Sequence, residues 1–114
     1  MNRARTARLL NLQLAMNVET LRALRKYGVS ASKKKRLDFQ FVAKRAADAR
    51  ALARALREYD GYEARWTKDG RDFVVYGASK PIAMAKRPLD EFVGHMCIIG
   101  AHHDAEFDGW GTSG

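Results

Sequence analysis

The sequence predicts a small α+β fold, in which a four-stranded antiparallel sheet carries two helices on one face and a further helix precedes the sheet. Three observations predict it. A helical apolar period fills the N-terminal quarter, strand-like and helix-like periods alternate after it, and an Asp-Gly pair at 69–70 separates two alternating stretches. A chain of 114 residues has room for one hydrophobic core. We therefore expect a single domain over residues 1–114, with an N-terminal helix within 1–30 and a core over 36–112.

The N-terminal helix is predicted over residues 4–27, and Gly28 stands where a helix C-cap is expected. Arginines before a short apolar run resemble a secretory signal, but Asn11 and Gln13 interrupt the run and helix-like sequence continues beyond it. We therefore expect this helix to belong to the domain. Its apolar stripe recurs at three- and four-residue steps and comprises Leu10, Leu14, Val18, Leu21 and Leu24.

The first half of the core reads as strand, helix and hairpin. Residues 36–42 alternate between apolar and polar side chains, which is typical of a strand with one buried face. Residues 43–59 return to a helical period, and residues 62–68 and 71–77 form two strands joined by a tight turn at Asp69-Gly70. The predicted apolar stripe of the helix comprises Ala49, Leu52, Leu56 and Tyr59.

The second half of the core ends on a helix and a strand. Residues 78–87 show no regular period, and Pro88 is well placed to open a helix because its missing N–H costs nothing there. Residues 105–110 read as the last strand. The order strand, helix, strand, strand, helix, strand is that of the split βαβ arrangement in ferredoxin-like folds. We therefore predict a ferredoxin-like βαββαβ sandwich with an extra N-terminal helix.

The strongest compositional bias is a formal net charge of +8. A positive field favours encounters with anionic partners such as RNA. The run Lys33-Lys34-Lys35-Arg36 could contact phosphates, and its alternative interpretation is a solvated loop. Aromatic residues on the predicted sheet could stack on bases, but the RNA-recognition signature is absent, so a core role is favoured. These aromatic residues are Phe39, Phe41, Trp66, Phe73 and Tyr76.

Residue types that carry catalysis or bind metal do not form a known motif. His102 and His103 are adjacent, so on a helix they point in different directions, and a solvated helix end is the favoured interpretation. Cys97 lies on the apolar helix beside Met96 and Ile98, which favours a small buried hydrophobe. We therefore expect a binding protein without catalytic residues, metal or cofactor. The lone cysteine and the lack of a long apolar run predict a cytoplasmic protein without a membrane span.

The closing stretch from Glu106 to Gly111 is the most informative part of the sequence. It joins a strand-like pair to two glycines around an indole, and Asp108-Gly109 is suited to an Asx-type turn or a β-bulge. Two interpretations of Trp110 stay open. The ring caps the core from an edge strand, or it is an aromatic anchor for a partner.

The motif resembles the closing strand of the regulator of ribonuclease activity B family. Members of this family are bacterial protein inhibitors of ribonuclease E. The resemblance extends more weakly through nearly the whole chain, and it implies a ferredoxin-like fold and a non-enzymatic role in RNA metabolism. It implies an endoribonuclease of the ribonuclease E type as the partner, whose cleavage of transcripts the protein lowers. RNA association through Lys33 to Arg36 is the alternative function. Described inhibitors of the family tend to be acidic, and this chain departs from that pattern. The residues that match the family signature are Glu106, Phe107, Asp108, Gly109, Trp110 and Gly111.

Overall fold

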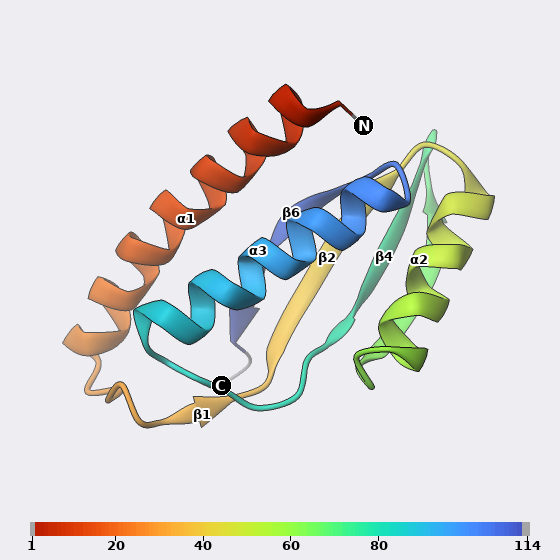
Figure 1. Ribbon diagram of the computed structural model, residues 1–114. Coiled ribbons are helices and arrows are strands. Elements are labelled where there is room, and N and C mark those ends of the chain that lie inside the picture. The colour runs from red at the N-terminus through yellow and green to blue at the C-terminus, as the bar shows by residue number, and fades with distance from the viewer. Residues whose placement is uncertain (1, 113–114) are drawn as a thin grey trace.

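A computed structural model describes residues 2–112 and shows an α+β protein with three helices and two antiparallel sheets in that range (Figure 1). A four-stranded sheet forms the centre, and a short two-stranded sheet lies at one end. The elements in chain order are α1 (Arg3–Lys26), β1 (Lys34–Lys35), β2 (Leu37–Ala43), α2 (Ala46–Glu58), β3 (Glu63–Asp69), β4 (Asp72–Ala78), β5 (Ile82–Ala83), α3 (Lys86–His102) and β6 (Ala105–Thr112).

The larger sheet has the strand order β3-β4-β2-β6, and each neighbouring pair is antiparallel. Strands β3 and β4 form the hairpin predicted at Asp69-Gly70, whose glycine has φ +61°. Helix α2 connects β2 to β3, and α3 leads into β6. The predicted α+β class, the four-stranded antiparallel sheet and the preceding helix are therefore confirmed.

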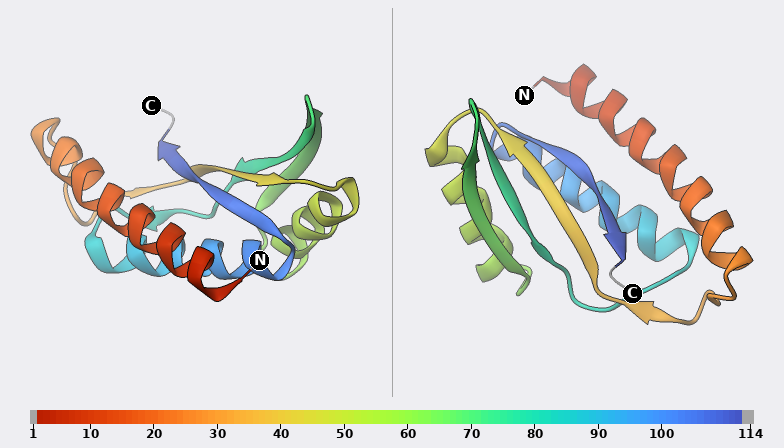
Figure 2. Two further views of the ribbon diagram at one scale, coloured as in Figure 1. Left: turned by 90° about the horizontal axis from the view of Figure 1, so that it is seen from above. Right: turned by 180° about the vertical axis from the view of Figure 1, so that it is seen from behind.

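All three helices lie on the same side of the larger sheet (Figure 2). Alternation along β2 decides which side chains meet them, because successive residues of a strand point to opposite faces. Leu37, Phe39, Phe41 and Ala43 are buried on the helix side, whereas Asp38 and Gln40 are exposed on the other. One contiguous core results, to which α2 contributes Leu52 and Leu56 and α3 contributes Leu89, Val93 and Met96.

Helix α1 lies beside α3 and along the outer edge of β6 (Figures 1 and 2). The four leucines of the predicted stripe, Leu10, Leu14, Leu21 and Leu24, are partly buried, but Val18 is 42% exposed. The most deeply buried side chains of α1 are polar, with Gln13 at 5% and Asn17 at 1% exposure. Gln13 and Asn17 share the covered side of the helix with these leucines, because each finds a hydrogen-bond partner on β6 there.

The junction between β2 and α2 lies later in the chain than predicted, β6 extends past residue 110 to Thr112, and one predicted core residue is exposed. Strand β2 continues to Ala43, which pairs with Phe73 and Ala105, so α2 begins only at Ala46 rather than at residue 43. Tyr59 caps the C-terminal end of α2 and is 84% exposed, so its predicted place in the apolar stripe is wrong. Pairing to strands on both sides fixes Ala43 more strongly than its helix propensity does.

The segment between β4 and α3 also differs from the prediction of an irregular stretch. Its residues Ile82 and Ala83 pair with Lys35 and Lys34 in the two-stranded sheet. Helix α3 begins at Lys86, so Pro88 stands inside its first turn, where the missing N–H leaves no hydrogen bond unmade.

Candidate functional site

Strand β6 contains the β-bulge that Asp108-Gly109 predicted. Phe107 pairs with Phe41, but Gln40, the residue before Phe41 in the antiparallel strand β2, pairs with Gly109. Asp108 therefore has no counterpart, and β6 holds one residue more than β2 at this point. Gly109 has φ +124°, a conformation that other residues rarely adopt. The extra residue reverses the alternation, so Trp110 returns to the helix side of the sheet, where it packs against the core.

The indole of Trp110 connects β6 to α1 and α3. Its Nε1–H donates a hydrogen bond to Oδ1 of the buried Asn17 over 2.8 Å. The Nδ2 group of Asn17 donates in turn to Oδ1 of Asp90 over 3.1 Å, and Lys86 donates to the other carboxylate oxygen. Burial opposes ionisation of Asp90, but the hydrogen bonds from Lys86 and Asn17 outweigh it and hold its pKa below the ordinary value.

Other parts of the closing motif also serve the fold. The Phe107 side chain is 1% exposed, and its ring centroid lies 5.2 Å from that of Phe41. Gln13 donates through Nε2 to the Phe107 carbonyl oxygen over 3.4 Å, so α1 supplies a donor to the outer edge of β6. Glu106 forms an ion pair with Arg5 of the same helix.

The sheet face opposite the helices is bare of helices within the described residues (Figure 2). We call it the open face. Cross-strand pairing arranges its side chains in three rows, each running from β3 through β4 and β2 to β6. The rows are Thr67, Val74, Val42 and Glu106; Arg65, Tyr76, Gln40 and Gly109; and Glu63, Ala78, Asp38 and Gly111.

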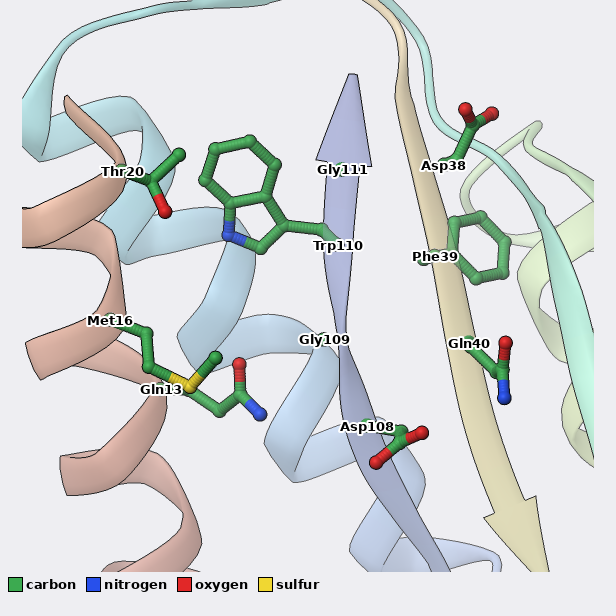
Figure 3. A pocket seen from close by; sticks show the side chains of 10 residues that line it. All are labelled: Gln13, Met16, Thr20, Asp38, Phe39, Gln40, Asp108, Gly109, Trp110 and Gly111. Carbon is green, nitrogen blue, oxygen red and sulfur yellow. The ribbon is translucent and has the colours of Figure 1, made fainter. Parts of the chain in front are cut away.

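Two of these rows end in glycine on β6, and a pocket of about 300 Å³ lies there (Figure 3). We call it the glycine hollow. Gly109 and Gly111 offer no side chain, so the hollow opens between Asp38 and Gln40 of β2 and the side chains of α1. Its lining residues are Gln13, Met16, Thr20, Asp38, Phe39, Gln40, Asp108, Gly109, Trp110 and Gly111.

A second hollow of about 450 Å³ lies on the other side of β2. It shares Asp38 and Gln40 with the glycine hollow and is bordered by Arg65 and Tyr76. Tyr76 is 41% exposed. The two hollows make the open face an uneven surface centred on Asp38 and Gln40, and such surfaces suit contact with another macromolecule better than a small ligand.

The open face and the adjoining bulge carry mostly acidic charge, although the chain as a whole carries +8. Glu63 pairs with Arg36 over 3.0 Å, and Glu106 pairs with Arg5. Within residues 2–112, neither Asp38 nor Asp108 forms an ion pair or a side-chain hydrogen bond. The two carboxylates that line the glycine hollow are therefore uncompensated.

The predicted basic run lies in and around β1. Lys34 and Lys35 form that strand, and Lys33 and Lys34 are exposed. Arg36 is engaged by the fold itself, since its Nε–H donates to the Ser79 carbonyl oxygen over 3.1 Å in addition to its pairing with Glu63. The role of this run in RNA contact stays a prediction.

The aromatic residues of the sheet divide between its two faces. Phe39 and Phe41 are buried on the helix side, and Trp66 and Phe73 pack partly buried against the same core. Tyr76 stands on the open face instead. The core interpretation is therefore confirmed for the first four residues, which leaves Tyr76 accessible for stacking on a partner.

Cys97 and His102 lie on α3, and His103 caps its C-terminal end. Cys97 is 1% exposed, and burial raises the pKa of its thiol to about 11. His103 contacts the Ile99 carbonyl oxygen through Nδ1 at 2.9 Å, near the end of α3. Among residues 2–112, no group of three or more histidine, cysteine or acidic side chains is placed to hold a metal ion. In the same range, no helix has the length and apolarity needed to cross a membrane.

Fold and site together define an α+β protein whose sheet is covered by helices on one face and presents, on the other, a hollowed surface lined by the carboxylates of Asp38 and Asp108. The family model described as regulator of ribonuclease activity B matches residues 14–112, from within α1 to the end of β6. The chain belongs to this family, whose description is that of a regulator of ribonuclease activity. None of the curated proteins compared with the chain matches it.

Proposed function

We propose that this protein is a non-catalytic regulator that binds an endoribonuclease of the ribonuclease E type and lowers its cleavage of transcripts. The observation that carries the proposal is the family match, which spans residues 14–112 and so includes every residue of the open face. The open face is the contact surface in this proposal, because it is hollowed and bare of helices.

We also infer that the core is ferredoxin-like. The strand order β3-β4-β2-β6 supports this inference, since the first and third core strands are neighbours and the second and fourth form the two edges. The connections agree with it, because α2 and α3 each join two strands that are separated by one other strand. The N-terminal helix α1 is then an addition along the β6 edge.

A regulator of transcript cleavage acts where transcripts are degraded, so we propose a bacterial cytoplasmic location. RNA association through Lys33 to Arg36 is the rival function, and the exposure of Lys33 and Lys34 is compatible with it. The two functions differ in what the protein binds. A regulator of the nuclease lowers cleavage by contacting the enzyme, whereas an RNA-associating domain lowers it by covering the substrate.

The test is a cleavage assay with purified ribonuclease E from the host and a fluorescently labelled transcript. We expect the initial rate to fall with added protein and to reach a plateau at concentrations near that of the nuclease. Ribonuclease A with the same transcript is the control and should be unaffected. Equal slowing of both nucleases would indicate that the protein covers the RNA. A Lys33→Gln and Lys34→Gln double variant should then lose the effect, in agreement with the rival function.

A further inference from the structure

We propose that the glycine hollow receives an arginine side chain from a basic segment of the protein partner. This inference rests on the proposed function for the identity of the partner, which is a ribonuclease, and it adds the chemistry by which the partner is recognised. The guanidinium group would lie over Gly109 and Gly111, between β2 and α1 (Figure 3).

Hydrogen-bond acceptors surround the hollow. Asp38 and Asp108 line it with carboxylates that have no partner within residues 2–112. Gln13 is 5% exposed and uses its Nε2 group for the Phe107 carbonyl, while its Oε1 atom lies on the side of Gly109 and accepts no hydrogen bond from the described residues. A ligand group with many hydrogen-bond donors and no acceptor can pair with these oxygen atoms, and the guanidinium group has five N–H donors.

The walls and the floor of the hollow favour arginine over lysine. Two of the lining side chains are apolar: Met16, which is 49% exposed, and the half-buried indole of Trp110. A guanidinium group is planar, is weakly hydrated and stacks on such surfaces, whereas an ammonium group is compact and strongly hydrated. The glycine floor lets a flat group approach the backbone of β6, because neither residue has a side chain to hold it away.

Charge gives an independent reason. The chain has 21 basic and 13 acidic residues, so basic side chains are available to most carboxylates. Glu63 and Glu106 on the same face are paired within the chain, but Asp38 and Asp108 are not. An arginine from a partner supplies the missing counter-charge. Phosphate groups of RNA would instead meet two carboxylates, and such like-charge contact is unfavourable.

The test measures binding of a fluorescently labelled peptide that alternates arginine with glycine, using fluorescence anisotropy at low salt. The Asp38→Asn and Asp108→Asn double variant should bind the peptide about five- to tenfold more weakly, because two exposed ion pairs are lost. Glu58→Gln and Glu91→Gln together are the matched control, since they remove two exposed carboxylates from α2 and α3 on the helix side. The corresponding lysine peptide should bind wild-type protein more weakly than the arginine peptide.

A second variant fills the hollow instead of changing its charge. A Cβ atom at Gly111 would meet nothing within 4 Å, so Gly111→Val is compatible with the backbone and should stay folded. It should bind the arginine peptide as weakly as the double variant does. Gly94→Ala on α3 is its control, because a Cβ atom there also has open space and lies outside the hollow. Circular dichroism and thermal unfolding verify that each variant is folded.

Three results would overturn the inference: unchanged peptide affinity in the double variant, equal affinity for the arginine and lysine peptides, or loss of RNA oligonucleotide binding in Gly111→Val. The ribonuclease itself separates this inference from the proposed function. If the nuclease binds wild-type protein and the double variant equally, the arginine site is wrong and the regulator proposal stands. If the nuclease binds neither wild-type protein nor the double variant, but the arginine peptide binds wild-type protein more tightly than the double variant, the site stands and the partner is another basic protein.

Discussion

The indole nitrogen of Trp110 and the side-chain oxygen of Asn17 lie 2.8 Å apart, although 93 positions separate the two residues in the chain. The bulge at Gly109 turns the ring toward α1, and the buried Asn17 accepts a hydrogen bond from the indole N–H. The motif therefore organises the fold and, by the same geometry, leaves two glycines on the open face.

Replacing Asn17 with alanine should destabilise the protein. The variant leaves the Trp110 N–H without its acceptor and takes a donor from Asp90, and losing a partly buried hydrogen-bond partner costs about 1–3 kcal/mol. The free energy of unfolding, measured by urea denaturation, checks the prediction. Asn11→Ala is the control, because Asn11 is exposed on the same helix and gains the same helix propensity. Equal stability of the two variants would contradict a stabilising role for Asn17.

The carboxylate of Asp90 should make stability depend on pH in the acid range. Its pKa is lowered in the folded protein, despite burial, by hydrogen bonds from Lys86 and Asn17. The unfolded chain, with an ordinary aspartate pKa of about 3.9, then binds more protons than the folded one as pH falls. The stability that Asp90 contributes is complete above that pH and is lost as pH falls through the lowered folded value.

Urea denaturation at neutral and at strongly acid pH tests this dependence. Asp90→Asn should be less stable than wild-type protein at neutral pH, and the difference should shrink in acid, where the wild-type carboxyl is protonated. Glu91→Gln, which alters the neighbouring exposed residue of α3, is the matched control. A difference for Asp90→Asn that stays constant across the range would mean that packing, rather than charge, makes the contribution.

Patterns within the strands and helices predicted much of this fold from sequence. Alternation over residues 36–42 and the turn at Asp69-Gly70 gave β2 and the β3–β4 hairpin, because both signals come from local geometry. The end of β2 was missed since Ala43 is a good helix former that two neighbouring strands hold in extended conformation. The pairing of β1 with β5 involves two residues on each side, too few for any period to be visible.

The candidate site was predicted less completely than the fold. The closing motif drew attention to Trp110 and to a bulge at Gly109, and the structure contains that bulge. Gln13 was interpreted only as an interruption of an apolar run, and the burial of Asn17 was not predicted, because nothing local shows which distant groups they meet. Asp38 precedes the buried Phe39 in an alternating strand and points to the opposite face, so its exposure was predictable. Its closeness to the β6 glycines depends on strand order, which no local pattern shows.

The thiol of Cys97 should be unreactive in the folded protein. Burial raises its pKa to about 11, so near pH 8 only about one molecule in a thousand carries the thiolate, which is the reactive form. We expect labelling by a disulfide reagent such as dithiobis-nitrobenzoate to be slow in buffer and prompt in urea, where the pKa returns to about 8.5. Prompt labelling of one thiol per chain in buffer, with circular dichroism unchanged, would contradict the buried position.

The two glycines of the closing motif should respond differently to the same substitution. Gly109 has φ +124°, so Gly109→Ala strains the bulge and should cost about 1–3 kcal/mol of unfolding free energy. Gly111→Ala meets open space without that strain, and its stability should stay within about 0.5 kcal/mol of wild type. Urea denaturation of both variants measures this contrast. Equal destabilisation would mean that the bulge does not depend on a glycine conformation, and the position of Trp110 would then need another cause.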